Sequence, residues 1–329
     1  MEQRQLGREG LTVSAVGLGA MGLSQGYGPA DDAQSRAVIR DALDLGVTLL
    51  DTAMSYGAGH NEKLIGAAIA GRRDEAVLAS KFGIVRGPDG VRVDGRPEQA
   101  RGYCEASLAR LGTDHLDLYY LHRVDPEVPV EETIGAMADL VAAGKVRHLG
   151  ICECTAAQLE RAVAVHPISA VQFEWSLTWR EGEDDIVPAA RRLGAGLVPY
   201  SPLGRGMLTA AMSPVSGPGD FRAGDPRFHG ADLTRNLALV SAVADVAAGL
   251  GITAGQLALA WLLARGPDVV PIPGTRHASR LAENAAAAGV RLTGADLARL
   301  EAAAPRAAWA GDRASFAAPV TTRTAAPGS

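Results

Sequence analysis

Short apolar runs alternate with amphipathic stretches along most of this chain. The apolar runs are rich in Val, Leu and Ile, which is typical of strands buried on both faces. The pattern predicts eight strands, near residues 15–19, 47–51, 76–81, 116–121, 146–151, 169–173, 196–200 and 268–272. The intervening stretches have helical periodicity and predict helices near residues 32–45, 61–70, 97–110, 130–143, 155–164, 184–193, 236–249, 254–265 and 278–288.

Strands that alternate with helices imply a parallel sheet covered by helices. Eight such units favour a closed α/β barrel, the (β/α)8 TIM barrel, over an open doubly wound sheet. Residues 3–6 and 11–14 flank a Gly-containing turn and predict a β-hairpin that caps the barrel.

We expect residues 1–316 to form this single barrel domain and residues 317–329 to form a flexible C-terminal tail. Two segments interrupt the alternation of strands and helices. Residues 83–95 read as a Gly-rich loop, and residues 203–235 as a long insertion before two extra helices. Long βα loops of a barrel, together with the C-terminal segment, surround its catalytic mouth and would shape a substrate pocket.

Composition narrows the functional class. The chain has 329 residues and a net charge of −5, which suggests neither a nucleic-acid nor a membrane surface. No apolar run is long enough to span a bilayer, and the N-terminus lacks the apolar segment of a signal peptide. Three cysteines are too few for a disulfide framework. We therefore expect a soluble, cytoplasmic protein.

Residues with ionisable side chains stand at the ends of three of the predicted strands. Asp51, Lys81 and His122 stand at these ends, and Tyr56 follows Asp51 on a loop. The same ends of parallel strands meet at one face of a barrel, so these side chains are candidates for one site. Asp51 would keep Lys81 charged, the ammonium would lower the pKa of the Tyr56 phenol, and His122 would orient a carbonyl oxygen. The set suits proton donation to a carbonyl that receives hydride from elsewhere.

In order and setting, these four residues resemble the catalytic tetrad of the aldo-keto reductases. The resemblance extends from about residue 3 to about residue 284. Residues 22–24 (Gly-Leu-Ser), 27–29 (Tyr-Gly-Pro) and 221–223 (Phe-Arg-Ala) are similar to the subgroup that includes perakine reductase and related plant and bacterial enzymes. The resemblance implies reduction of small aldehydes and ketones to alcohols, with hydride from a nicotinamide cofactor.

The resemblance also implies where that cofactor binds. The matching positions are Gly22, Cys152, Gln172, Tyr200, Ser201, Pro202, Leu203, Arg205, Gly206, Gly274, Thr275, Arg276, Arg280, Glu283 and Asn284. Gln172 corresponds to the ligand of the carboxamide, and Tyr200 to the aromatic residue that stacks under the nicotinamide ring. Arg276 and Arg280 are four residues apart at the start of a predicted helix, where guanidinium and backbone N–H groups suit a phosphate. NADPH is therefore expected rather than NADH.

Two positions depart from the family pattern. Cys152 and Glu153 stand where many members have Ser and Asn, and a thiol is a weaker hydrogen-bond donor than a hydroxyl. Gly274 stands where many members have a lysine. Recognition of the 2′-phosphate would then depend on Arg276 and Arg280, and use of NADH stays possible.

Three further residues are candidates for the substrate pocket. Tyr27 and Met54 lie on loops at the predicted mouth of the barrel, and Trp175 follows the sixth strand. An aromatic residue at position 175 fits a core position or a pocket wall equally well. No metal is expected, because Cys152 and Cys154 are separated by one residue and have no second pair.

Two other functions are compatible with parts of this pattern. Some relatives of the fold are cofactor-sensing regulatory subunits with slow or no turnover, and an intact tetrad does not exclude such a role. A barrel isomerase or lyase would have no use for the cofactor segment around Arg276 and Arg280 and would not bind NADPH.

Overall fold

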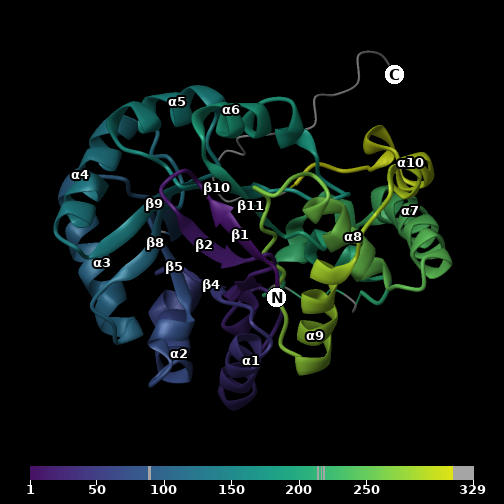
Figure 1. The fold of residues 1–329 in the computed structure, drawn as a ribbon, viewed down its shortest axis with the longest axis horizontal. Helices are drawn as coiled ribbons and strands as arrows, with labels where there is room; N and C mark the ends of the chain where they lie inside the picture. The colour runs from purple at the N-terminus through teal and green to yellow at the C-terminus, as the bar shows by residue number, and fades with distance from the viewer. Residues whose placement is uncertain (88–89, 213–214, 216, 218, 314–329) are drawn as a thin grey trace.

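The computed structural model describes residues 1–87, 90–212, 215, 217 and 219–313. Within these residues, seven parallel strands form one sheet that curves into a nearly closed barrel (Figure 1). In both chain order and sheet order the strands are β3 (Leu18–Gly19), β4 (Leu49–Asp51), β5 (Val77–Phe82), β8 (Leu116–Leu121), β9 (Val146–Cys152), β10 (Ala170–Glu174) and β11 (Gly196–Tyr200). Each strand pairs with its chain neighbours, as repeated βα units require. The predicted α/β barrel is confirmed.

Residues 268–273 occupy the place of the predicted eighth strand without forming a regular one. The N–H groups of Val270 and Ile272 donate to carbonyls of β11 over 2.8 and 3.1 Å. On the other side, the carbonyls of Pro271 and Pro273 accept from backbone N–H groups of residues 17 and 19 over 3.0 and 3.3 Å. Prolines have no N–H to donate, so half of the hydrogen bonds on that side are missing. The segment closes the barrel but is too irregular to count as a strand.

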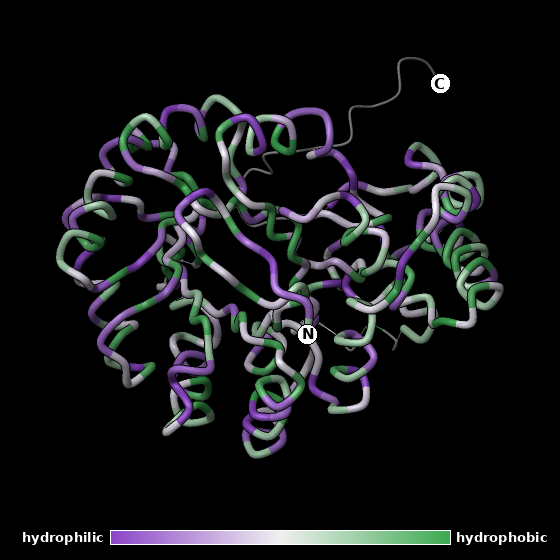
Figure 2. Tube along the Cα trace, viewed as in Figure 1, coloured by the Kyte–Doolittle hydropathy of each residue, from purple (hydrophilic) through white to green (hydrophobic). Residues whose placement is uncertain are grey.

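Helices surround the barrel (Figure 1). Those that follow the strands are α1 (Asp32–Asp44), α2 (His60–Ala68), α3 (Pro97–Leu111), α4 (Val130–Ala142), α5 (Ala156–Val165), α6 (Ile186–Leu193) and α9 (Ala278–Ala286). Local signals explain several of their ends. Asp31 caps α1, and Thr155 forms a capping box with Gln158 at the start of α5. Figure 2 shows hydrophilic and hydrophobic residues mixed along these helices, as expected for helices with one buried face.

Three more helices complete the described fold. They are α7 (Gly230–Gly249), α8 (Ala254–Leu263) and α10 (Gly294–Ala303); α7 packs against the other two, and α8 also packs against α9. The pattern predicts α7 and α8 but not α10, in which Leu300 is the one buried residue. Among the described helices, none alone is both long and apolar enough to cross a membrane. The pair α7 and α8 meets those criteria only when combined, across a bend of 85°.

The two irregular segments contain more structure than predicted. The Gly-rich loop holds a β-hairpin, β6 (Ile84–Gly87) and β7 (Gly90–Val93). The described part of the long insertion holds three short 3-10 helices, η5 (Gly204–Thr209), η6 (Phe221–Gly224) and η7 (Pro226–Phe228). The remaining short helices are η1 (Met21–Leu23), η2 (Tyr56–Gly59), η3 (Arg73–Glu75), η4 (Glu181–Glu183), η8 (Ala287–Gly289) and η9 (Arg306–Ala308). The predicted C-terminal tail lies outside the described residues.

The predicted N-terminal hairpin is present as β1 (Gln3–Leu6) and β2 (Leu11–Ser14). Leu6 packs so closely on β11 that a Cβ at Gly196 would lie 2.5 Å from its side chain. The Ser14 hydroxyl accepts a hydrogen bond from the N–H of Thr48, just before β4. These contacts close the end of the barrel at which the strands begin, so a ligand site belongs at the other end.

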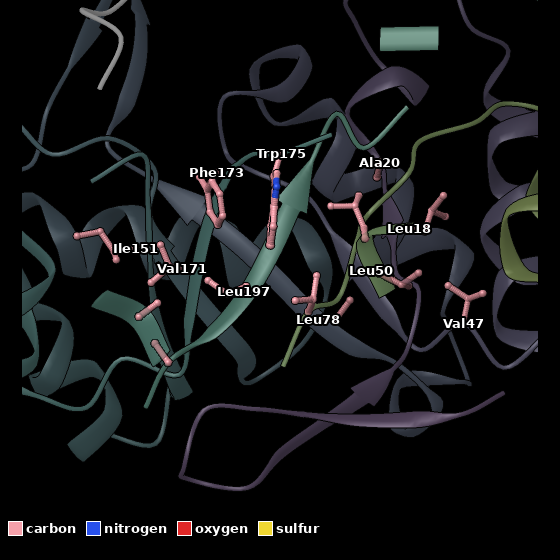
Figure 3. Close-up of a cluster of buried hydrophobic side chains, with 14 of the residues drawn as sticks. Leu18, Ala20, Val47, Leu50, Leu78, Ile151, Val171, Phe173, Trp175 and Leu197 are labelled. Atoms are coloured by element: carbon pink, nitrogen blue, oxygen red, sulfur yellow. The ribbon is translucent and has the colours of Figure 1, made fainter. Parts of the chain in front are cut away.

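Side chains alternate between two apolar layers along each strand. One cluster fills the barrel interior and includes Leu49, Ala79, Leu118, Tyr120, Ala170 and Val198. The other lies between the strands and the helices; Figure 3 shows part of it, including Leu18, Leu50, Leu78, Ile151, Val171 and Leu197. This two-residue period decides which strand-end residues face the interior of the barrel and which face the helices.

Candidate active site

The predicted catalytic residues follow the inward-facing layer to its end. Two residues further along each strand than the interior cluster, the next inward-facing positions are Asp51, Lys81, His122, Gln172 and Tyr200. They lie toward the carboxyl ends of β4, β5, β8, β10 and β11. The alternation of the strands therefore turns all five toward the interior at one end of the barrel.

Asp51 and Lys81 form a buried ion pair at the centre of this end. The Lys81 ammonium donates to Asp51 Oδ1 and, over 2.8 Å, to the carbonyl of Thr52. Gln172 Nε2 donates to the other Asp51 oxygen over 2.8 Å. Burial alone would lower the pKa of Lys81, but the Asp51 carboxylate raises it above its ordinary value. Lys81 is therefore a permanent cation, as the sequence predicts.

Tyr56 brings its hydroxyl to this cation. Its Oη lies 3.4 Å from Lys81 Nζ, and the ammonium is 5.1 Å from the centre of the ring. The turn that carries Tyr56 depends on Gly57, which has a φ of 56° and donates its N–H to Gln25 Oε1 over 2.9 Å. Burial raises the pKa of the Tyr56 phenol, and the Lys81 ammonium lowers it; burial has the larger effect, so the pKa lies above its ordinary value. The expected influence of Lys81 is present, but it offsets burial only in part.

His122 completes the group from the end of β8. Its ring meets the Tyr56 ring edge-on, with centroids 5.8 Å apart and planes at 82°. Burial lowers the pKa of His122 well below its ordinary value, and the cations Arg123 and Lys81 lower it further. Its Nδ1 is buried with no hydrogen-bond partner among the described residues. His122 is therefore a neutral imidazole beside the phenol.

A cavity of about 820 Å³ opens at this end of the barrel. Its size lies in the range of small-molecule and cofactor sites. The predicted site residues that line it are Gly22, Tyr27, Asp51, Tyr56, His122, Gln172, Tyr200, Ser201, Pro202, Leu203, Arg205, Gly206, Gly274, Thr275, Arg276, Arg280, Glu283 and Asn284. One cavity thus joins the proposed catalytic and cofactor positions. Lys81, directly behind Tyr56, does not line it.

Trp175 and Met54 do not line the cavity, which corrects their expected place in a substrate pocket. Trp175 continues the outward-facing series of Val171 and Phe173, is 1% exposed and stacks on Phe173 with ring centroids 5.5 Å apart (Figure 3). It also meets Trp261 edge-on at 6.2 Å, between the barrel and the helices. Met54 packs against the same outer layer. Tyr27 is the one predicted pocket residue at the cavity wall.

Cys152 also lies away from the cavity, contrary to its expected cofactor contact. Its side chain is 1% exposed and packs in the apolar cluster inside the barrel. Burial raises the pKa of this thiol well above its ordinary value, so it is not a reactive thiolate. The described residues contain no group of three or more His, Cys, Asp or Glu side chains placed to hold a metal.

Glu153, Tyr200 and Arg313 form a second buried group that the sequence does not predict. Arg313 Nη1 donates to Glu153 Oε1 over 2.8 Å, and Nη2 donates to Oε2. The Tyr200 hydroxyl donates to Glu153 Oε1 over 2.8 Å and accepts from Arg313 over 3.1 Å. Glu153 is visible in the sequence as a departure from the family pattern. Its partner is not, because 160 positions separate the two residues.

Glycines explain the close approach of the segments at the cofactor end of the cavity. A Cβ at Gly274 would lie 2.7 Å from the carbonyl oxygen of Gly19, and a Cβ at Gly19 would lie 2.7 Å from that of Ile272. A side chain at position 274 would force the segment around it away from β3. The departure at Gly274 is therefore required by packing in this chain.

The start of α9 presents two arginines to the same cavity. Arg276 donates to the backbone carbonyls of Tyr27 and Pro29. Arg280, in the first turn of α9, is exposed and has no hydrogen-bond or ion-pair partner anywhere in the part of the chain described. Glu283, which also lines the cavity, accepts from the Thr253 hydroxyl over 2.5 Å. This end can therefore receive an anionic group.

Comparisons with known proteins agree with this geometry. The model of the aldo/keto reductase family matches residues 15–305. A protein described as probable aldo-keto reductase 1, from Glycine max, is 43% identical over 314 residues, covering 94% of this chain and 90% of the relative.

Solved structures agree as well. The glycerol dehydrogenase of Gluconobacter oxydans superposes with a TM-score of 0.84 at 29% identity, covering 92% of this chain and 94% of that one. An aldo/keto reductase from Klebsiella pneumoniae, solved with NADP and acetate, superposes with a TM-score of 0.72 at 29% identity over 92% and 96% of the two chains. With the matched barrel and its strand-end residues, this chain belongs to the aldo/keto reductase family of oxidoreductases.

Proposed function

We propose that this protein reduces aldehydes or ketones to alcohols with NADPH, and that Tyr56 is the proton donor. The observation that carries the proposal is the Tyr56 hydroxyl, which lies 3.4 Å from the buried Lys81 ammonium at a cavity that His122 also lines. A phenol beside a cation and a neutral imidazole, at the wall of a cofactor-sized cavity, suits acid catalysis on a carbonyl.

The residues present fit a nicotinamide cofactor. The cavity connects the tetrad to α9, and the loop between them contains Ser201 and Gly206, whose φ angles of 49° and 93° are left-handed. Such backbone turns expose N–H groups that can approach a pyrophosphate closely. Gln172 and Tyr200 would hold the nicotinamide end. The cofactor, when bound, supplies the hydride that the carbonyl carbon accepts.

Tyr56 supplies the other hydrogen. A carbonyl that gains hydride at carbon needs a proton at oxygen to become an alcohol, and the Tyr56 hydroxyl is placed to give it. The phenolate left behind is stabilised by Lys81 at 3.4 Å, and Asp51 holds the ammonium in place through the buried ion pair. Electrostatic stabilisation of this kind is strong in a buried site, where water screens charges poorly.

His122 orients the carbonyl. Its lowered pKa keeps the imidazole neutral at physiological pH, so it can offer an N–H to the carbonyl oxygen without carrying a charge of its own. Its edge-on position beside the Tyr56 ring brings a second donor to the same oxygen. We infer that the neutral imidazole positions the substrate and that Tyr56 transfers the proton.

The preference for NADPH over NADH rests on Arg276 and Arg280. Both line the cavity at the start of α9, where backbone N–H groups add to their attraction for a phosphate. The Arg280→Ala variant is expected to bind NADPH about tenfold more weakly, as loss of a charge-assisted hydrogen bond requires. Its affinity for NADH, which lacks the 2′-phosphate, should change little.

The direct test is a fluorescence titration with NADPH and NADH, followed by absorbance at the nicotinamide band with a panel of aldehydes and ketones. Tight NADPH binding with turnover supports the reductase. Binding without turnover across the panel contradicts it and favours the cofactor-sensing role. A protein that binds neither nucleotide would leave the buried tetrad without its proposed function.

A further inference from the structure

A short C-terminal segment, residues 309–313, runs from α7 to the wall of the cavity, which it reaches at Arg313; we call it the C-terminal strap. The side chain of Asn236 in α7 forms two hydrogen bonds with the backbone of Ala310, over 2.8 and 3.0 Å. Gly311 has a φ of 80°, and a Cβ there would lie 2.9 Å from the backbone nitrogen of Arg227. Only glycine fits this turn without displacing the neighbouring chain.

The strap ends by placing Arg313 among the strand ends. Arg313 is 6% exposed at the wall of the cavity, and its side chain binds both oxygens of Glu153. Its guanidinium also lies 5.3 Å from the centre of the Trp179 ring. A planar guanidinium that meets a carboxylate at both oxygens and stacks on an aromatic ring is held in one orientation.

Glu153 depends on this arginine. It is 5% exposed, and Arg313 is the only cation in ion-pair contact with it in the described part of the chain. Burial alone would raise the pKa of Glu153, but Arg313 lowers it most, with smaller contributions from Arg123 and the Tyr200 hydrogen bond, so the pKa is below its ordinary value and the carboxylate is charged. A charged carboxylate buried without its cation would be strongly unfavourable.

The same pair holds the Tyr200 hydroxyl. Tyr200 donates to Glu153 and accepts from Arg313, so its oxygen is fixed on two sides while its ring lines the cavity. A tyrosine anchored at both its backbone and its hydroxyl has little freedom to rotate, and its ring face is therefore presented to a ligand in one orientation.

We propose that Arg313 is a positioning residue for the cofactor: the C-terminal strap brings it to Glu153, and the pair fixes the Tyr200 ring under the nicotinamide. This inference rests on the proposed function, which gives Tyr200 its role. It makes cofactor affinity depend on a segment that lies outside the eight βα units.

The chain contains a closely matched control. Arg180 binds both oxygens of Glu183 over 2.9 Å each and lies 5.1 Å from the centre of the Trp261 ring. It is 9% exposed, and neither residue of this pair lines the cavity. The Arg180→Gln variant therefore removes a two-oxygen contact of the same kind, partly buried and joined by a bond from Arg180 to Glu301 over 2.6 Å, without touching the proposed cofactor site.

The experiment compares Arg313→Gln with Arg180→Gln in the full chain, using two probes. NADPH occupies the whole cofactor site, whereas adenosine 2′,5′-bisphosphate carries only the phosphates and adenosine that α9 would bind. For Arg313→Gln we expect the NADPH Kd to rise about tenfold or more, as loss of charged hydrogen bonds predicts, with the bisphosphate Kd within about twofold of wild type. For Arg180→Gln both Kd values should stay within about twofold while Tm falls.

Either of two results overturns the proposal. One is an unchanged NADPH Kd in Arg313→Gln, and the other is equal weakening of both probes, which would indicate a general loss of structure. If Arg313→Gln does not fold, the double variant Glu153→Gln/Arg313→Gln leaves no buried charge unpaired and serves instead; wild-type NADPH affinity in that variant overturns the proposal. A wild-type protein that fails to bind NADPH would instead refute the proposed function.

Discussion

Two buried groups at the barrel mouth contain the same three kinds of side chain in different order. In the first, Lys81 lies between Asp51 and Tyr56, so the phenol meets a cation. In the second, the Tyr200 phenol donates directly to the Glu153 carboxylate, and Arg313 binds both. Each group has a carboxylate at a strand end, a cationic side chain and a tyrosine, and both tyrosines line the same cavity.

The difference in order gives the two phenols different chemistry. Burial raises the pKa of both. Lys81 opposes this effect at Tyr56, whereas the carboxylate of Glu153 adds to it at Tyr200. A phenol beside an ammonium leaves a stabilised phenolate when it loses its proton, while a phenol bonded to a carboxylate keeps its proton. The first arrangement suits a proton donor, and the second suits a fixed wall.

Removing the hydroxyl of Tyr56 or of Tyr200 should give the largest difference between the two groups. Tyr56→Phe removes the proposed proton donor and is expected to lower kcat by roughly 10²–10⁴-fold, the usual contribution of acid catalysis, with NADPH binding retained. Tyr200→Phe keeps the ring and should lower kcat far less at saturating cofactor. Steady-state kinetics on both variants tests this. Equal losses in the two, or near wild-type activity in Tyr56→Phe, would contradict the assignment.

Removal of Lys81, the cation of the first group, should lower both stability and activity. Lys81→Met leaves Asp51 buried without its partner, which is expected to destabilise the fold by roughly 3–5 kcal/mol in urea unfolding. Adding Asp51→Asn removes the unpaired charge and should restore much of the stability. Activity should remain low in both variants, because the phenolate would still lack its ammonium. Recovery of turnover in the double variant would show that Lys81 has only a structural role.

Removal of the Glu153 carboxylate, the acid of the second group, should lower stability less than removal of Lys81. Glu153→Gln leaves Arg313 without its main partner, but Glu174 remains 3.6 Å from the guanidinium. We expect a loss of roughly 2 kcal/mol, below the range for a buried pair broken outright. The same urea experiment measures it. A loss as large as that of Lys81→Met would mean that Glu174 does not compensate.

His122 is expected to give the smallest difference; its ring contacts Tyr56 of the first group. Its pKa is lowered on folding, so between that pKa and about 6.5 the unfolded chain binds more protons than the folded one. Stability from this group is therefore present above pH 6.5 and is lost as the pH falls. His122→Gln should lose less stability than wild type between about pH 7 and about pH 5. Parallel stability curves for the two proteins would show that His122 is not linked to folding in this way.

The sequence predicts the first group because its members lie close together in the chain. Asp51, Tyr56 and Lys81 fall within two consecutive βα units, and each strand-end position follows from the apolar run before it. The two-residue alternation of a strand then fixes which side chains face inward. Applied to β10, the same rule turns Gln172 inward and Trp175 outward, which favours the core position for Trp175 over a pocket wall.

The second group was not accessible, because its pairing is decided by the path of the chain in space. Glu153 stands out in the sequence, but nothing local marks Arg313 as its partner across 160 positions. The eighth strand shows the same limit, since its apolar pattern is correct while Pro271 and Pro273 remove half of the hydrogen bonds on one side. The sequence by itself determined the barrel and the inward-facing residues of its strand ends, because local periodicity decides both. The tertiary structure alone decided which distant charge meets which, because that depends on where the C-terminal strap folds back.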